Sequence, residues 1–360
     1  MRDETPEQKQ PLRTGLTTGA CATATSLAAA KLLLTGEPSE TIEIALPRGK
    51  RVAFDLTACA LNGDVARADT VKDAGDDPDA THGATVFAQV QLREDPGVVF
   101  TAAEGVGTVT RTGLTLAVGE PAINPVPREM MSAHLTQLAD ALSYSGGFDV
   151  AIGIVNGEKI AEQTMNGRLG ILGGLSILGT TGIVRPYSCA AFIASIHQGI
   201  DVAIANGVEH IAACTGSTSE RVAYETYGLE DMGLLEMGDF AGAVLKYIRK
   251  KSIARVSFVG GFGKLSKLAD GHLDLHSRRS SVNFDGLSLL ASQFDSALGE
   301  KIQSCNTTAE ALQYSQQAGV ALGDRVCERA MTTIRKYANQ NTRVDVIAID
   351  RSGEIVGRAS

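Results

Sequence analysis

The chain has 360 residues, of which 44% are hydrophobic and 21% charged, so it is long enough for a large core and predicts two domains. Its formal net charge of −8 argues against a nucleic acid or an anionic membrane as the partner, because such proteins carry a basic patch or stripe. The six cysteines include no CxxC pair, which favours buried reduced thiols over a zinc site, and we expect no protein-bound metal.

No stretch of the chain predicts a membrane span. The longest uncharged segments, 14–30 and 169–184, are shorter than the ~20 apolar residues that a span needs. Segment 14–30 has the position of a signal peptide, but its centre is mostly Thr, Ala and Gly. A buried helix is the better interpretation of that segment.

The first part of the chain predicts an α+β domain over residues 12–146, after a polar, disordered tail at 1–11. We expect helices at 18–34 and at 128–142, the second opened by a proline whose missing N–H does no harm there. Alternation of apolar and polar residues predicts strands at 41–46, 51–56, 85–93, 98–102 and 114–118.

From residue 147 strands and helices alternate, which is typical of a parallel sheet, so we assign 147–340 to a Rossmann-like α/β domain. The expected strands are 150–155, 210–215 and 255–260, and the expected helices are 190–206, one from 219, 240–250, 307–318 and 321–338. A strand at 343–349 then turns back into 354–357. Residues 341–360 therefore form a strand pair whose domain membership stays open.

The segment 168–188 is unusual because five glycines interrupt an apolar run, with Thr180 and Thr181 near its end. Glycine at this density lets a backbone approach a ligand closely and exposes amide donors. The same pattern also suits a tight helix–loop crossing inside a core. The residues alone leave both interpretations open.

Two other stretches have charged side chains suited to chemistry. Segment 71–83 places four aspartates and His82 around a proline, which suits a hard cation, a general base or simply an acidic surface loop. Segment 260–264 is a glycine loop after a strand, but it lacks the spacing of a P-loop and of the dinucleotide fingerprint. Basic residues follow it at 264–279, where a solvated face and an anion cradle are both open.

Several motifs together resemble one family, the cobalt-precorrin-5B C1-methyltransferases of cobalamin biosynthesis. They are LRTGLTTGACATAT (12–25), VKDAGDDPDATHGA (71–84), GEPAINPVPREMM (119–131), NGRLGILGGLSILGTTGIVRPYS (166–188), MGDF (237–240) and GKLSKLADGHLDLHS (263–277). The resemblance implies a cytoplasmic enzyme that transfers a methyl group from S-adenosylmethionine to carbon 1 of cobalt-precorrin-5B, giving cobalt-precorrin-6A. It also implies an α+β domain joined to a Rossmann-like one, not the tetrapyrrole-methylase fold.

The chain departs from the common family pattern in three places. The loop after the strand at 210–215 reads CTGSTSE where a proline–glycine–asparagine run is common, and Gly261 stands where a histidine is common. Gly167 stands where proline is common. A catalytic role for the missing histidine cannot hold in this chain.

The resemblance also implies roles for individual residues. The methionine carboxylate of the donor suits the amides of Gly173 and Gly174 or of Gly216, with Thr180 and Thr181 nearby in sequence and Glu220 for the ribose hydroxyls. His82 or Asp73 is the candidate base for a proton that leaves the ring. Basic side chains suited to the carboxylates of the tetrapyrrole substrate are Arg128, Arg185, Lys264, His276 and Arg278.

Other functions remain open. A tetrapyrrole carrier without catalysis would bind the macrocycle but not the donor, and the same methyl transfer could act on a metal-free precorrin. A nucleotide-dependent kinase or oxidoreductase is disfavoured by the failed phosphate and dinucleotide motifs. The resemblance implies a small polycarboxylate tetrapyrrole as the partner, and a homo-oligomer stays open.

Overall fold

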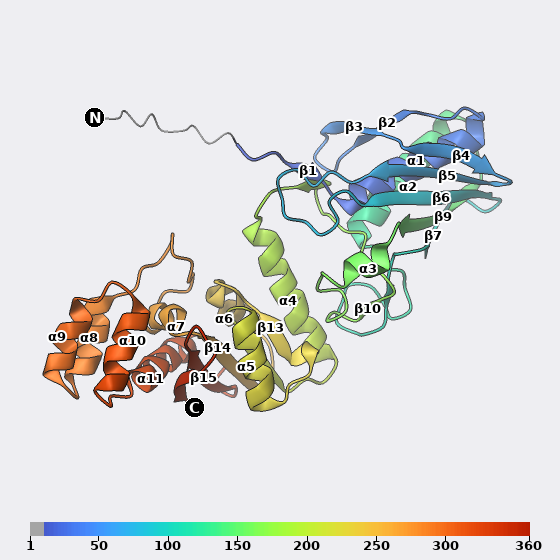
Figure 1. The fold of residues 1–360 in the computed structure, drawn as a ribbon. Coiled ribbons are helices and arrows are strands. Elements are labelled where there is room, and N and C mark those ends of the chain that lie inside the picture. The colour runs from blue at the N-terminus through green and yellow to red at the C-terminus, as the bar shows by residue number, and fades with distance from the viewer. Residues whose placement is uncertain (1–10) are drawn as a thin grey trace, which may run out of the picture. The chain divides into compact units, whose positions relative to one another are not determined.

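The computed structural model describes residues 11–360, which divide into two compact units, 11–189 and 190–360 (Figure 1). Both units combine helices with β-sheets, so the fold is mixed α/β. The predicted tail at 1–11 lies outside the described residues except for Pro11. No helix among residues 11–360 is both long and apolar enough to cross a membrane.

The first unit is built on a five-stranded sheet in the order β4-β5-β6-β9-β7. Its strands are β4 (Ala58–Asn62), β5 (Val65–Val71), β6 (Thr85–Arg93), β7 (Gly97–Ala102) and β9 (Gly147–Ile154). All neighbours are antiparallel except β7 and β9, which run parallel. The predicted strand at 85–93 is confirmed residue for residue, whereas β4 and β5 were missed.

Helix α1 (Thr18–Thr35) lies in the core of this unit and contacts β5, β6 and α2 (Pro125–Ala141). Its many small side chains are buried on nearly every side. The hairpin β2 (Thr41–Ala45) and β3 (Arg51–Asp55) confirms the predicted pair of strands. The shorter elements are β1 (Gly15–Leu16), β8 (Thr108–Val109), α3 (Gly157–Ala161), β10 (Ile171–Leu172) and β11 (Ile183–Val184).

Two expectations for this region are wrong. The predicted strand at 114–118 is a run of bends and turns. The predicted boundary at 146/147 falls before β9, which pairs along its full length with β6 and therefore belongs to the first sheet. Because a strand that is hydrogen-bonded on both edges cannot leave its sheet, the compact units divide only after residue 189.

The second unit contains a five-stranded sheet in the order β13-β12-β14-β15-β16. Four of its strands are parallel, namely β12 (His210–Cys214), β13 (Leu234–Glu236), β14 (Arg255–Gly261) and β15 (Arg343–Ile349). The antiparallel edge strand β16 (Ile355–Ala359) pairs with β15, so the last strand pair is part of this sheet. The parallel sheet expected from the alternation of strands and helices is present.

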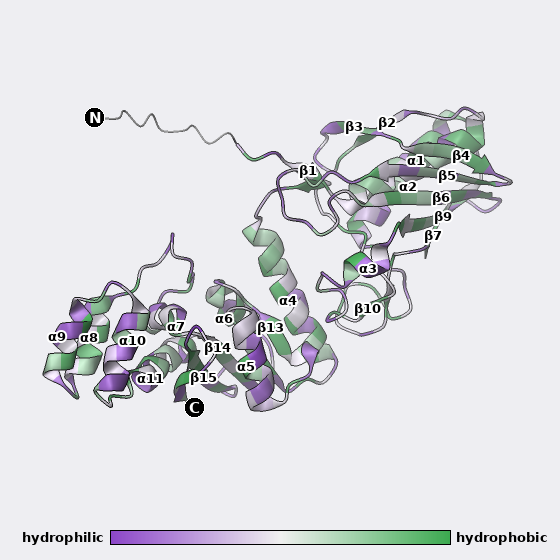
Figure 2. Ribbon diagram, in the orientation of Figure 1, coloured by the Kyte–Doolittle hydropathy of each residue, from purple (hydrophilic) through white to green (hydrophobic). Residues whose placement is uncertain are grey.

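Helices connect these strands and pack against the sheet to form the second core. They are α4 (Cys189–Ala205), α5 (Ser217–Tyr227), α6 (Ala241–Ile248), α7 (Phe262–Ala269), α8 (Phe284–Ser292), α9 (Ser296–Gln303), α10 (Thr308–Gln317) and α11 (Leu322–Arg335), with a short 3-10 turn at Asp231–Gly233. Figure 2 shows α4 as largely hydrophobic and α5 as largely hydrophilic. Helices α8 and α9 were not predicted.

A polar network lies at the amino ends of the central parallel strands. The Ser257 hydroxyl donates to Asp345 Oδ2 (3.0 Å) and lies 2.8 Å from His210 Nε2. Arg255 also donates to Asp345 Oδ2 (2.5 Å) and lies over the Tyr227 ring. Burial and the charge of Arg255 lower the pKa of His210 to about 4, so the folded protein holds this imidazole neutral.

This network predicts a pH dependence of stability. The pKa of His210 rises to about 6.5 on unfolding, so below that pH the unfolded chain binds a proton that the folded protein does not. The stabilisation of the folded state that comes from neutral His210 is therefore complete above pH 6.5 and is lost as the pH falls towards 4. The variant His210→Asn should flatten the fall of the urea midpoint between pH 7 and pH 4. His272→Asn, which changes an exposed histidine, is the matched control and should leave the profile unchanged. Parallel profiles for parent and His210→Asn would contradict this role.

Candidate functional site

A cavity of about 650 Å³ opens at the carboxyl ends of β12, β14 and β15 in the second unit. We call it the strand-end cavity. Its polar and charged walls come from residues 215–219, Gly261, Gly263, Lys264, Lys267, Thr308, Asp350 and Arg351. Its apolar walls come from Phe262, Val282, Ala309, Leu312 and Ile349.

The position of this cavity follows from the strand order. After β12 the chain continues to β13 on one side of β12 and then returns to β14 on the other side. Such a reversal separates the loops that follow the two strands and leaves a crevice between them. The loops concerned are those at 215–216 and 261, which both line the cavity.

Three helices begin at the strand-end cavity. Helix α5 follows Gly216, α7 follows Gly261, and α10 follows Thr307, whose hydroxyl caps the Glu310 amide at 3.2 Å. The first amides of a helix lack partners within the helix and carry a partial positive charge. Residues from the first turn of each helix line the cavity, which therefore favours an anionic group.

Two lysines add positive charge to this wall. Lys264 Nζ donates to the Thr215 carbonyl (3.1 Å) and lies 3.0 Å from Asp239 Oδ1. Lys267 is buried and donates to the Leu275 carbonyl (3.0 Å). Because each ammonium group has three donors, Lys264 keeps hydrogen-bonding capacity beyond these two contacts.

The turn that begins at Asp350 adds a negative charge to the lining of the strand-end cavity. Asp350 Oδ1 accepts from the amides of Ser352, Gly353 and Glu354, each at 2.9 Å, and from the Ser352 hydroxyl at 2.6 Å. These bonds, led by that of the Ser352 hydroxyl, lower the pKa of Asp350 and keep it ionised. Together with the cationic wall, this turn lets the cavity accept a ligand with charges of both signs.

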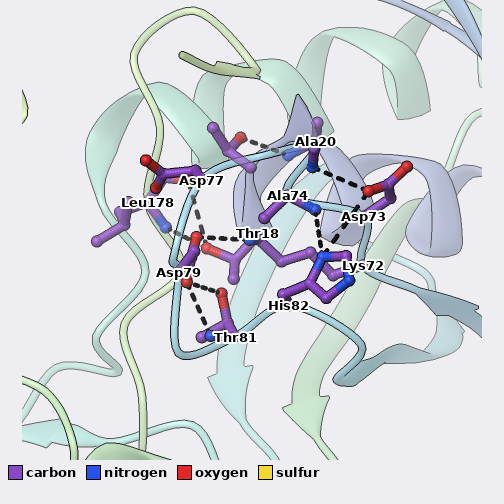
Figure 3. Close-up of polar contacts among 12 residues, drawn as sticks. Thr18, Ala20, Lys72, Asp73, Ala74, Asp77, Asp79, Thr81, His82 and Leu178 are labelled. Carbon is purple, nitrogen blue, oxygen red and sulfur yellow. Dashed lines mark hydrogen bonds and ion pairs between the residues drawn. The ribbon is translucent and has the colours of Figure 1, made fainter. Parts of the chain in front are cut away.

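The first unit contains a second polar cluster, formed by the acidic loop 72–82 beside the start of α1 (Figure 3). Lys72 is 1% exposed and its Nζ donates to Asp79 Oδ2 at 2.6 Å. The other oxygen of Asp79 accepts from the amide and the hydroxyl of Thr81, at 2.8 and 2.6 Å. The buried ion pair holds the loop in one conformation, because separating either partner would leave a charge without compensation.

Asp73, one candidate base, is bound on both carboxylate oxygens by the Arg13 guanidinium. This pairing lowers the pKa of Asp73 to about 2. A carboxylate with so low a pKa is a weak proton acceptor near neutral pH. The geometry therefore suits a structural role, in which Asp73 fastens the segment at 13–16 to the acidic loop.

His82, the other candidate base, is half exposed, and its Nδ1 accepts a hydrogen bond from the Ala74 amide (3.1 Å; Figure 3). Because a neutral imidazole has one donor and one acceptor nitrogen, this bond assigns the proton to Nε2. Neutral His82 thus presents an N–H donor to solvent, and its basic nitrogen is already engaged. This arrangement opposes the predicted role of general base.

The glycine-rich segment 173–182 packs against the start of α1. The Leu178 carbonyl accepts from the Gly19 amide, and the Leu178 amide donates to the Thr18 hydroxyl, both at 3.0 Å. A Cβ on Gly174 would lie 2.3 Å from the Gly105 carbonyl oxygen, and one on Gly179 would lie 2.4 Å from Thr17 Oγ1. Much of this glycine content is therefore required by close backbone crossing.

The remaining predicted donor residues of the first unit are more accessible. Gly173 is exposed with no atom near the position of a Cβ, and Thr180 is exposed. The Thr181 hydroxyl donates to the Ile183 carbonyl at 3.2 Å. Glu220, predicted for the same ligand, lies in the first turn of α5 in the second unit but is not part of the cavity lining.

The predicted substrate cations have different surroundings. Arg128 is engaged within the first unit, where it donates to the carbonyls of Ile123 and Pro121 and to Glu120. Arg185, His276 and Arg278 are exposed.

Of the predicted site residues, only Gly216 and Lys264 line the strand-end cavity, and sequence reasoning missed Thr308, Asp350 and Arg351 there. Thr307 with Glu310 three residues later was the available signal for the start of α10.

The second unit of this mixed α/β fold has a polar cavity at the carboxyl ends of its parallel strands, which is the usual place of a small-molecule site in such sheets. The CbiD family model matches residues 5–186, and the model described as CbiD, C-terminal domain matches residues 274–360. The chain belongs to the CbiD family.

Named relatives match the whole chain. It is 60% identical to the cobalt-precorrin-5B C(1)-methyltransferase of Pseudomonas savastanoi pv. phaseolicola, covering 100% of this chain and 98% of the relative. It is also 60% identical to the protein of that name from Burkholderia cenocepacia, covering 100% of both. A crystal structure of the cobalamin biosynthesis protein cbiD from Archaeoglobus fulgidus matches with 27% identity and a TM-score of 0.40, over 70% of this chain and 78% of that one.

The acidic loop gives a prediction for the first unit. A Cβ on Gly15 would lie 2.0 Å from the Ala74 carbonyl carbon, so Gly15→Ala should displace the loop that holds His82. We expect a loss of about 2 kcal/mol in the free energy of unfolding and a lower kcat/KM. Gly167→Ala is the matched control, because a Cβ there meets nothing within 4 Å. Thermal unfolding and activity should distinguish the two variants, and equal behaviour would exclude this close approach.

Proposed function

We propose that this chain is the methyltransferase that adds a methyl group to carbon 1 of cobalt-precorrin-5B, giving cobalt-precorrin-6A, with S-adenosylmethionine as donor. Two full-length relatives with 60% identity have the name of this activity. The structural observation that supports it is the strand-end cavity at the reversal of the parallel sheet. A cavity of about 650 Å³ is within the usual range for a ligand of the donor's size.

We also propose the finer domain description. The second unit is Rossmann-like, because four parallel strands alternate with helices and the ligand cavity lies at the carboxyl ends. The first unit is an α+β domain. This combination differs from the tetrapyrrole-methylase fold.

The residues of the strand-end cavity fit the donor. Its carboxylate suits the start of α5 at Gly216 and the ammonium of Lys264, while Asp350 suits the donor's positive charge. The adenine ring suits the apolar wall that includes Val282 and Leu312. S-adenosylmethionine supplies an electrophilic methyl group on a sulfonium, so the task of the chain is chiefly to position the donor and acceptor.

For His82 we propose a hydrogen-bond donor in place of the predicted base. The Ala74 amide fixes its tautomer, and the exposed Nε2–H is suited to an oxygen of the polycarboxylate substrate. Asp73 is then the partner that holds Arg13. Neither residue has to move a proton in this proposal.

The proposed reaction has a direct test. The protein is incubated without oxygen with cobalt-precorrin-5B and methyl-labelled S-adenosylmethionine, and the product is analysed by mass spectrometry and NMR. Label at carbon 1 is the expected result. Binding of the macrocycle without donor binding would favour the carrier function, and transfer only to the metal-free macrocycle would change the substrate.

The placement of the donor in the strand-end cavity predicts the effect of replacing Lys264. Lys264→Met should raise the Kd for S-adenosylmethionine by roughly 10- to 100-fold, because a charge-assisted hydrogen bond is worth roughly 1.5–3 kcal/mol. Lys301→Met changes an exposed lysine of α9 and is the matched control. Titration calorimetry with donor alone measures both. A weaker affinity for the tetrapyrrole with unchanged donor affinity would instead place Lys264 in the substrate site.

The role of His82 predicts a difference between two variants. Glutamine places an amide donor near the position of Nε2, so His82→Gln should keep kcat/KM within a few-fold of the parent, while His82→Ala should lose about tenfold. A general base would lose on the order of 10² or more in both variants. Steady-state kinetics with varied tetrapyrrole decides between these outcomes.

A further inference from the structure

The second unit has another cavity, of about 470 Å³, between α4 and α6. We call it the α4–α6 cavity. Helix α4 contributes Ile193 and His197, and segment 273–274 contributes Leu273 and Asp274. The residues of α6 and its flanks are Phe240, Gly242, Ala243, Lys246, Tyr247 and Lys250. None of these residues was predicted from the sequence as part of a site.

The aromatic part of this wall is held rigidly. The rings of His197 and Tyr247 stack with centroids 3.9 Å apart and planes 8° apart. The Tyr247 hydroxyl donates to Asp201 at 2.5 Å, and Lys251 donates to the same carboxylate at 2.6 Å. Lys251 Nζ lies over the Tyr247 ring, 4.7 Å from its centroid, so the ring face that remains for a flat ligand is the outer face of His197. Because this ring is fixed in advance, it loses little conformational entropy when a ligand covers it.

The rim of the cavity is basic in an acidic protein. Segment 246–251 (KYIRKK) has four cations in six residues, whereas the whole chain has a net charge of −8. The charge of Lys251 is balanced by Asp201. Lys246 and Lys250 are exposed, line the cavity and stand four residues apart, so their charges repel each other. An anionic ligand would remove that repulsion.

One carboxylate also lines this cavity. Asp274 Oδ1 accepts from the His276 amide at 3.1 Å, which fixes it in the turn at 274–276. The charges on the lining are therefore two lysines against one aspartate, with His197 on the aromatic wall. The balance still favours an anion near the two lysines.

The α4–α6 cavity lies beside the strand-end cavity. Asp239, which faces Lys264 of the strand-end cavity, is followed directly by Phe240, which lines the α4–α6 cavity. The Leu275 amide donates to the Asp239 carbonyl (2.9 Å), and the Leu275 carbonyl accepts from Lys267 of the strand-end cavity. Asp239 and Leu275 thus connect the lysines of the strand-end cavity with Phe240 of the α4–α6 cavity.

We propose that the α4–α6 cavity binds the tetrapyrrole acceptor of the methyl transfer. The aromatic and apolar wall contacts a face of the macrocycle, and Lys246 and Lys250 bind its peripheral carboxylates. This inference rests on the proposed function, because it assigns the substrate of that reaction to this cavity. The contacts of Asp239 and Leu275 connect the acceptor cavity with the donor cavity.

The test uses the full chain and two probes. Uroporphyrin, a tetrapyrrole with peripheral carboxylates, is titrated by fluorescence, and the KM for cobalt-precorrin-5B is measured in the methyl-transfer assay. The double variant Lys246→Ala/Lys250→Ala should weaken both by about tenfold and leave the Kd for S-adenosylmethionine unchanged. Lys301→Ala/Lys336→Ala is the matched control, since it removes two exposed cations of the same unit that do not line either cavity.

A second variant tests the aromatic wall. His197→Ala should also raise the KM for the tetrapyrrole, while charge-preserving Lys246→Arg/Lys250→Arg should retain binding. Unchanged uroporphyrin affinity and unchanged KM in the double alanine variant would overturn the proposal. Failure of the parent protein to transfer methyl groups would instead overturn the proposed function, so the two failures are distinguishable.

Discussion

The burial of α1 on nearly every side is the constraint on which the first unit depends. A helix can be enclosed by a sheet, a second helix and a crossing segment only if its side chains are small and its polar groups are satisfied. The hydroxyls of Thr23 and Thr25 donate to carbonyls one turn back. The Thr18 hydroxyl instead bonds the backbone of segment 176–178, so the start of α1 sets the position of the glycine-rich crossing.

Local signals predicted the elements whose pattern is set by nearby residues. The capped helix at 18–34 and the alternating strand at 85–93 are of this kind. Strand β9 was assigned to the wrong domain, because its sequence specifies a buried strand but not its partner, and β6 lies more than fifty residues earlier in the chain. Residues 114–118 alternate in the manner of a strand but form bends and turns, because alternation alone does not provide a neighbouring strand to pair with.

The candidate site was predictable where a loop follows a strand. Gly216 and Lys264 lie in loops that follow predicted strands, and ligands gather at the carboxyl ends of parallel strands. Thr308 was not, since it reaches the cavity only through the packing of α10 on α7, where a Cβ on Gly263 would lie 2.8 Å from its hydroxyl oxygen. The Lys246–Lys250 pair was visible as a charge run, but the stacking of His197 on Tyr247 brings together two helices that are distant in sequence.

The placement of the cysteines has a consequence for an enzyme that holds an alkylating cosubstrate. A thiolate competes with the acceptor for an activated methyl group, and a thiol reacts far more slowly. Cys214 ends β12 directly before Thr215 of the strand-end cavity, yet it is buried, and its thiol faces the carbonyls of Ala212 and Ser219 at 3.6 and 3.7 Å. Burial also raises the pKa of the Cys21 thiol to about 12. Burial thus shields Cys214 and Cys21 from an alkylating donor, whereas Cys189 is exposed.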